Sequence, residues 1–190
     1  MKYISTLVTI ISLFMIGCQE TSPTPKPRAY PKIEFPERKY RVYEMQGCPV
    51  KFEYPSYAQI KPKEQACWFD LVISSLNARI HCSYIQVNNR EGFDDLVGDA
   101  FVIADKINER SNYMEQALIG NDHDVNGLMF IWTGPAASPV HFFLSDTMHH
   151  FFKAALYFDS KVNPDSLAPI SAFIREDINH MITSFEWKTK

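Results

Sequence analysis

The sequence lacks a hydrophobic run long enough to span a bilayer. Its longest apolar stretch, Leu7 to Ile16, covers about ten residues and is interrupted by Thr9 and Ser12, whereas a transmembrane helix needs about 20. Lys2 precedes this stretch, as in the charged first part of a secretory signal peptide. The beginning of the chain therefore predicts export and argues against a membrane-spanning helix at this point.

A cysteine directly follows the apolar stretch. In the run Leu13 to Cys18 the small residue Gly17 stands before Cys18, and a lipoprotein signal peptidase requires a small residue beside the bond that it cleaves. We predict a lipoprotein signal peptide over residues 1–17 and lipidation of Cys18, which places the remaining chain outside the cytoplasm. The alternative is an uncleaved signal anchor with an incidental cysteine.

An excess of positive charge is also missing. The chain has 19 Lys and Arg residues against 22 Asp and Glu residues and a formal net charge of −3. Proteins that bind nucleic acid usually show a basic patch or stripe, so we expect no nucleic-acid partner. The chain that follows the signal peptide is long enough for one domain with its own core.

Cysteine is scarce, and its few positions predict one disulfide. Of the four cysteines, Cys18 is assigned to the lipid, and the oxidising cell envelope favours a bridge between two of the other three. Cys48 and Cys67 flank a predicted strand, whereas Cys82 alternates with Ile80 on a predicted core face. We predict a Cys48–Cys67 bridge and a free Cys82, with the other pairings as alternatives.

Proline is concentrated in one segment near the beginning of the chain. The prolines that alternate there with basic residues are Pro23, Pro25, Pro27, Pro31 and Pro36. This composition favours an extended polyproline II conformation, so we predict a lipidated spacer over residues 18–40. Tyr30 and Phe35 give the spacer more apolar bulk than a passive linker needs. They are candidate partner-binding residues, and the alternative is that they pack on their own domain.

Periodicity predicts an α+β fold in which a mainly antiparallel β-sheet is packed with two helices. Strands are predicted at residues 50–54, 68–73, 78–87, 116–119, 127–133, 140–144 and 150–158. Apolar residues three and four apart predict a helix from Phe93 to about Glu109, with Asp94 and Asp95 at its amino-terminal cap. A second helix is predicted with Pro169 in its first turn. All these elements fall in a single predicted domain, residues 41–190.

The spacing signatures of common catalytic and metal sites are absent. Ser145, Asp146, His149 and His150 combine nucleophile, acid and base within six residues, but no G-x-S-x-G motif presents the serine. The Asp-His-Asp run at residues 122–124 lacks the spacing of a calcium loop. We interpret both runs as turns, and we predict no catalytic residue, no metal and no cofactor.

Aromatic residues are dense in the last third of the chain. They include Phe142, Phe143, Phe151, Phe152, Tyr157 and Phe158. Alternation along a strand sends adjacent residues to opposite faces of the sheet. If one face is uncovered, Phe143 and Phe151 are exposed and are candidate partner-binding residues. If both faces are covered, the same residues belong to the core, and the sequence leaves these two alternatives open.

The chain resembles the gliding-motility lipoprotein GldD family of Bacteroidetes. The segments that carry the resemblance are Pro25–Pro31 (PKPRAYP), Phe52–Pro55 (FEYP), Cys67–Asp70 (CWFD), Gly134–Pro139 (GPAASP) and Ala154–Phe158 (AALYF). The resemblance implies a cell-envelope lipoprotein required for gliding motility and associated with type IX protein secretion, without enzymatic activity. The order of elements is also similar to the PsbP/Mog1-like α+β sandwich, an analogy of topology that carries no function.

Two hypotheses about function remain. In the first, which the resemblance favours, the protein is a non-enzymatic accessory or assembly factor whose partners are envelope proteins of the gliding and secretion machinery. In the second, it is a periplasmic small-ligand-binding domain or hydrolase that uses His149, His150 or the turn at residues 122–124. The second hypothesis requires a pocket where these groups converge. In both we expect a lipid-anchored domain that faces the periplasm, at either the inner or the outer membrane.

Overall fold

The computed structural model describes residues 33–159 and 163–188. Their elements in chain order are β1 (Tyr40–Glu44), β2 (Val50–Pro55), β3 (Gln59–Pro62), β4 (Trp68–Ile73), the short 3₁₀-helix η1 (Ser74–Leu76), β5 (Ala78–Gln86), α2 (Arg90–Asn108), β6 (Tyr113–Asn121), β7 (Val125–Thr133), β8 (Val140–Ser145), β9 (His150–Phe158), α3 (Pro164–Thr183) and β10 (Glu186–Trp187). The predicted signal peptide, Cys18 and Tyr30 lie outside the described residues.

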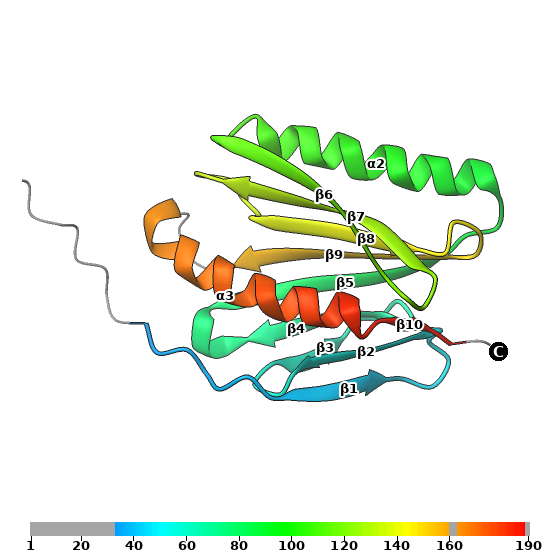
Figure 1. The fold of residues 1–190 in the computed structure, drawn as a ribbon, viewed down its shortest axis with the longest axis horizontal. Helices are drawn as coiled ribbons and strands as arrows, with labels where there is room; N and C mark the ends of the chain where they lie inside the picture. Colours follow the sequence, from blue (N-terminus) through cyan, green and yellow to red (C-terminus); the bar gives the residue numbers. More distant parts are fainter. Residues whose placement is uncertain (1–32, 160–162, 189–190) are drawn as a thin grey trace, which may run out of the picture. The chain divides into compact units, whose positions relative to one another are not determined.

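The described strands form two antiparallel sheets. The large sheet has the strand order β3-β4-β5-β9-β8-β7-β6, and the small sheet has the order β1-β2-β10. In Figure 1, α2 covers one face of the large sheet, while α3 and the small sheet lie on the other side. This architecture confirms the predicted α+β fold with a mainly antiparallel sheet and two helices.

The main core lies between the large sheet, α3 and the small sheet. Its centre is a set of phenylalanines from different elements: Phe52 in β2, Phe69 in β4, Phe152 in β9 and Phe185 after α3, each with at most 1% of its surface exposed. The ring of Phe52 lies 5.7 Å from that of Phe185 and 6.0 Å from that of Phe69. Aromatic pairs at such distances add to the stabilisation from burial. These contacts hold the small sheet against the large one.

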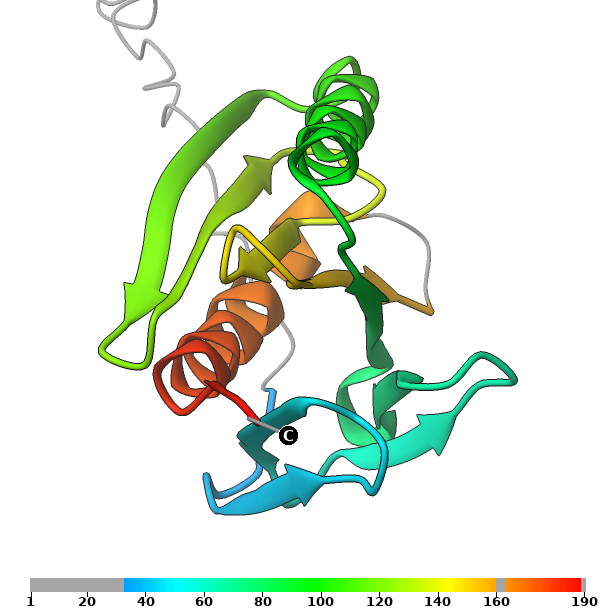
Figure 2. The ribbon, with the colours of Figure 1, turned by 90° about the vertical axis from the view of Figure 1, so that its right-hand side faces the viewer.

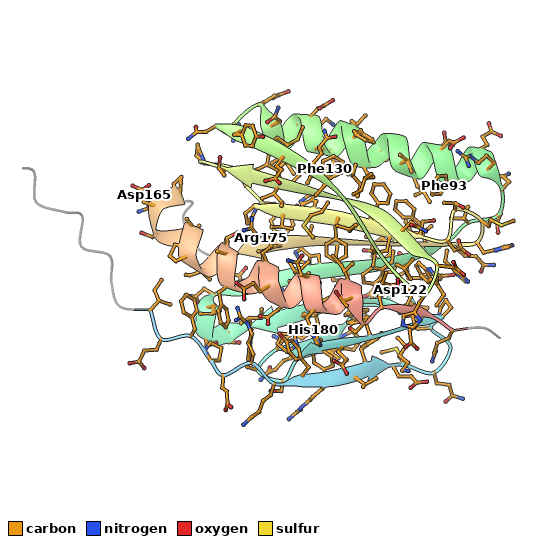
Figure 3. All side chains as sticks on the ribbon, viewed as in Figure 1. Phe93, Asp122, Phe130, Asp165, Arg175 and His180 are labelled. Atoms are coloured by element: carbon orange, nitrogen blue, oxygen red, sulfur yellow. A yellow bond between two sulfur atoms is a disulfide. The ribbon has the colours of Figure 1, made fainter. Side chains whose placement is uncertain are left out.

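A second, smaller core lies between α2 and the opposite face of the large sheet. Phe143 and Phe151 belong to it, with 7% and 1% of their surfaces exposed, and their rings stack at 5.1 Å. Figure 3 shows Phe93 and Phe130 in the layer between α2 and the strands. Both faces of the sheet are therefore covered in this region. The alternative in which Phe143 and Phe151 form an exposed partner-binding surface is wrong, because α2 buries them.

Both helices begin at other residues than the sequence predicted. The α2 helix is capped by Asn89, whose Oδ1 accepts a hydrogen bond from the Gly92 N–H at 2.8 Å, whereas Asp94 and Asp95 were expected at the cap. The α3 helix begins at Pro164, so Pro169 lies inside it. Proline is well tolerated at the first helical position because its missing N–H would have no partner there, and Asn163 and Pro164 supply this start.

The disulfide between Cys48 and Cys67 is present, with 5.5 Å between the two Cα atoms. Cys48 lies in the connection between β1 and β2, and Cys67 directly precedes β4. The bridge therefore joins the small sheet to the large one. Cys82 is free and buried, as predicted.

The sequence did not predict three of the strands: β1, β3 and β10. The compact unit begins at Ile33, so the last part of the predicted spacer packs on the domain. Between residues 33 and 188, apart from the undescribed 160–162, we find no helix that is long and apolar enough to cross a membrane.

Candidate functional site

The segment that enters the domain is fixed to α3 by its aromatic and basic residues. The Phe35 ring stacks on that of Phe173 at 4.4 Å, and the Arg38 guanidinium lies 4.2 Å from the centre of the same ring. Arg38 also forms ion pairs with Glu176 at 2.9 Å and with Asp177 at 3.4 Å. Of the two predicted roles for Phe35, the structure therefore shows packing on its own domain, although 39% of its surface stays exposed.

Asp177 is the buried acceptor at the centre of this attachment. Its carboxylate has 1% of its surface exposed and accepts hydrogen bonds from the Tyr40 and Tyr57 hydroxyls. Burial and the hydrogen bond to Asp177 raise the pKa of Tyr40 to about 12, and the same causes raise the pKa of Tyr57 further. Both tyrosines therefore remain protonated donors, and residues 33–40 hold one position on α3.

The serine, aspartate and histidine run forms the turn between β8 and β9. The Ser145 hydroxyl donates a hydrogen bond to the His150 carbonyl oxygen at 2.7 Å. Asp146 Oδ1 accepts from the backbone N–H groups of Met148, His149 and His150 at 2.8–3.0 Å. Burial works against ionisation of Asp146, but these N–H groups lower its pKa. Ser145 is thus bound to a backbone carbonyl, and an imidazole does not orient it.

The two histidines of this turn nevertheless line a cavity. It has a volume of about 680 Å³ and is bordered by Asp146, His149, His150, Tyr84 and Trp187, among others. The His150 ring stacks on that of Trp187 at 5.0 Å, and its Nδ1 lies 2.7 Å from the Tyr84 hydroxyl. Burial lowers the pKa of His150. We call this space the end cavity.

The Asp-His-Asp run at residues 122–124 does not reach the end cavity. It belongs to the turn between β6 and β7, where the Asn121 side-chain amide donates to the carbonyl oxygens of Ile182 and Phe185 at 2.8 and 2.7 Å. This turn therefore ties β6 to the end of α3. Within the part of the chain that the structure describes, no group of three or more His, Cys, Asp or Glu side chains could hold a metal ion.

An exposed apolar groove lies between α2 and β6. Its volume is about 320 Å³, and its large apolar lining residues are Phe93, Phe101, Leu118, Leu128 and, at 7% exposure, Phe143. Leu118 has 90% of its surface exposed and Phe101 38%. We call this hollow the α2–β6 groove. An exposed apolar patch of this kind is typical of an interaction site.

The α2–β6 groove lies beside a free sheet edge. Among the described strands, β6 is hydrogen-bonded to β7 alone, and it ends the large sheet. Figure 2 shows β6 as the outermost strand on one side of the domain. An edge strand presents N–H and C=O groups that another extended chain can bind. The α2–β6 groove therefore lies next to main-chain groups that can form hydrogen bonds with a partner.

This surface was not identified from the sequence. Periodicity predicted a strand over residues 116–119 only, whereas β6 runs from Tyr113 to Asn121. One signal was present: this stretch carries a single charged residue, Glu115, and places Leu118 on the same face as Gln116. That β6 lies at the sheet edge follows from the strand order, which no local pattern specifies.

Comparison with known protein families gives a match over most of the chain. Residues 20–187 match the family model described as gliding motility lipoprotein GldD. No curated protein sequence matches the chain. The family match begins close to Cys18 and includes every described helix and strand.

Proposed function

The chain belongs to the gliding motility lipoprotein GldD family, and from this membership we propose that it is a non-enzymatic accessory or assembly factor associated with type IX secretion. As a gliding-motility-related lipoprotein it is attached to the membrane through a lipid. In this proposal the domain faces the periplasm and binds other envelope proteins of the gliding and secretion machinery.

The observation that carries the proposal is the α2–β6 groove beside the edge of β6 that no other described strand pairs with. Proteins usually protect an edge strand with charges, prolines or a covering element, but β6 has nine residues, one of which is charged, and it exposes Tyr113 and Leu118. Such an edge suits β-strand addition, in which main-chain hydrogen bonds give affinity and side-chain pockets give specificity. The partner is thus an extended segment of an envelope protein with an apolar side chain for the groove.

The attachment of the entering segment to α3 is compatible with this partner. Phe35 and Arg38 contact Phe173 of α3, which lies on the opposite face of the large sheet from α2. A strand added to β6 therefore does not displace these contacts. The Ser145 hydroxyl is bonded to a backbone carbonyl, which argues against a role for this serine as a nucleophile.

Crosslinking in intact cells followed by purification of the tagged lipoprotein tests the proposal. We expect the native protein to recover components of the motility or secretion machinery, and Leu118→Ser combined with Phe101→Ser to lose them. Val42→Ser is the matched control, because Val42 is an apolar residue with 53% of its surface exposed on β1 of the small sheet. If the groove variant and the native protein recover the same components in equal amounts, the α2–β6 groove is not the binding site.

A second candidate function, a periplasmic small-ligand-binding domain, is favoured by the end cavity. Of the groups that this hypothesis names, His149 and His150 both line the end cavity, whereas the turn at residues 122–124 does not. Because Trp187 stacks on His150, a ligand in the cavity should change the fluorescence of Trp187. A saturable change that disappears in Trp187→Phe would support this function, and a change that persists would place the ligand elsewhere.

A further inference from the structure

The strand register places one small residue among four larger ones on the α2 side of the large sheet. Ala155 of β9 is paired with His81 of β5 on one side and with His141 of β8 on the other. Lys153 and Tyr157 lie two residues before and after Ala155, and therefore point to the same face. A methyl group surrounded by four long side chains leaves a hollow, which we call the Ala155 hollow.

The Ala155 hollow is a partly covered cavity of about 220 Å³. Ala100 and Ile103 of α2 cover it from above, and Phe130 of β7 contributes to its wall. Apolar protein cavities of about 150 Å³ bind benzene. A water molecule occupies roughly 30 Å³, so the hollow has room for about seven groups of that size. It is thus large enough for one ring or a short hydrocarbon chain.

Three hydrogen-bond donors border the hollow without an acceptor among the described residues. They are the Lys153 ammonium, the Tyr157 hydroxyl and the Ser83 hydroxyl. Ser83 and Lys153 are direct partners across β5 and β9, so their side chains are close neighbours. Tyr157 lies four residues after Lys153 on β9, on the other side of Ala155, so Ser83 and Lys153 form one polar end of the hollow. Polar groups placed at one end of an apolar pocket commonly fix the orientation of a ligand.

Among the residues that the structure describes, no carboxylate forms an ion pair with Lys153. The Asp70 carboxylate, with 6% of its residue surface exposed, pairs with Lys63 at 2.8 Å and with His81 at 2.6 Å. Arg79 pairs with Asp159 at 3.1 Å. Both carboxylates are therefore paired with other cations, Asp70 with Lys63 and Asp159 with Arg79. The positive charge of Lys153 remains available for an anion.

His141 supplies an uncharged aromatic wall. Burial, together with the nearby charge of Lys153, lowers its pKa to about 4, so the ring is neutral at pH 7. It contacts the Trp132 ring edge to face at 5.2 Å. The inner part of the hollow is thus apolar and uncharged, while the positive charge lies at Lys153.

We propose that the Ala155 hollow binds a small amphipathic carboxylate, with its carboxylate on Lys153 and Ser83 and its apolar group under Ala100 and Ile103 of α2. The apolar group has about six to eight carbon atoms, from the cavity volume. Hydrogen bonds from an ammonium and hydroxyls to a carboxylate are charge-assisted and stronger than neutral ones. The hollow borders β5, β9, β8 and, through Phe130, β7, and it shares Phe143 with the α2–β6 groove. The variants that test the two sites nevertheless differ, because Lys153 and Ala155 line the hollow alone and Phe101 and Leu118 line the groove alone.

Octanoate is the probe, added to the lipidated protein in lipid nanodiscs, with ¹³C in the alanine methyl groups of the protein. We expect saturable shifts of the Ala100 and Ala155 methyl signals, because both line the hollow. Ala58 in the main core and Ala168 in α3 are internal controls and should not move. Shifts spread over all four residues, or no saturable shift up to millimolar octanoate, would overturn the proposal.

Two variants and one analogue separate the parts of the site. Ala155→Leu fills the hollow and should abolish binding, and Lys153→Gln keeps its shape and should weaken binding about tenfold or more, as expected for a charged hydrogen bond. Octanol, which lacks the carboxylate, should bind at least about tenfold more weakly than octanoate for the same reason. Equal affinity for octanoate and octanol, or unchanged affinity in Lys153→Gln, would contradict the assigned orientation.

Discussion

Three polar residues of the interior, Asp70, Asp177 and His141, are accommodated in different ways. Asp177 is surrounded by the donors Tyr40, Tyr57 and Arg38, and Asp70 is matched by cations at the rim of the sheet. His141 Nε2 is buried and has no hydrogen-bond partner among the described residues. A buried polar atom without a partner costs free energy. The two aspartates have partners for their charge, whereas His141 has none at Nε2. The fold is therefore stable only with His141 in its neutral form.

This requirement predicts a pH dependence of stability that His141→Phe should remove. The folded-state pKa of about 4 lies below the ordinary 6.5, so the unfolded chain binds a proton first as pH falls through 6.5. Native stability attributable to His141 is therefore intact above pH 6.5 and is lost progressively down to pH 4, by as much as about 3 kcal/mol. Phenylalanine keeps an aromatic ring against Trp132 and cannot bind a proton.

Urea denaturation of both proteins between about pH 7.5 and pH 4 measures this effect. We expect similar free energies of unfolding above pH 7 and a growing advantage of His141→Phe below pH 6.5. The comparison cancels the other titrating groups, including His150, which both proteins contain. A difference between the two proteins that stays constant with pH would contradict the buried, neutral state of His141.

At the scale of elements, the sequence predicted both described helices and the described strands of six or more residues, which pack on one or the other of the two cores. Residues 68–73 and 150–158 were predicted with the bounds of β4 and β9, because both are short runs rich in β-branched and aromatic residues, most of which are buried. The strands β3 and β10 were missed since they have four and two residues, too few for a period. Phe143 and Phe151 could not be assigned because alternation identifies opposite faces without telling whether a helix covers each one.

One glycine allows β7 and β8 to pair closely. A Cβ atom at Gly127 would lie 1.8 Å from the Phe143 carbonyl oxygen, far inside van der Waals contact, and Gly127 faces Leu144 in the register. We expect Gly127→Ala to destabilise the fold severely, because the backbone of β8 must move. The yield of soluble protein and its thermal unfolding temperature measure this effect.

Gly98→Ala provides the control for this substitution. Gly98 lies within α2, and a Cβ atom at this position would meet no other atom within 4 Å. Alanine is favoured over glycine in a helix by up to about 1 kcal/mol, so this variant should be as stable as the native protein or more stable. Similar behaviour of the two variants would contradict the close approach of β7 and β8.

The disulfide acts between the two sheets. Cys48 and Cys67 are separated by 19 positions in sequence, and closing a loop of this length stabilises a protein by about 3 kcal/mol in the chain-entropy model. Reduction should therefore lower the unfolding temperature by roughly 6–12 °C. A Cys82→Ser variant keeps the bridge and should show the same decrease on reduction. If reduction leaves the unfolding temperature unchanged, the bridge does not contribute to the stability of the domain.

At the scale of the whole molecule, the proposed sites depend on contacts between distant parts of the chain. Phe101 and Leu118 come from a helix and an edge strand, and Ala155 lies between two histidines only because β9 separates β5 from β8. No local pattern specifies this strand order. The Cys48–Cys67 pairing could be predicted, since it depends on residue type, compartment and position along the chain. Lipidation of Cys18 stays a prediction.

The central claim is that an envelope protein binds at the α2–β6 groove, and a photo-crosslinking residue at position 118 in living cells tests it most directly. Leu118 is 90% exposed, and the same residue placed at Val42, which is 53% exposed on β1, is the control. We predict a discrete adduct with a motility or secretion component from position 118 and none from position 42. No adduct from position 118, or the same adducts from both positions, would contradict the claim.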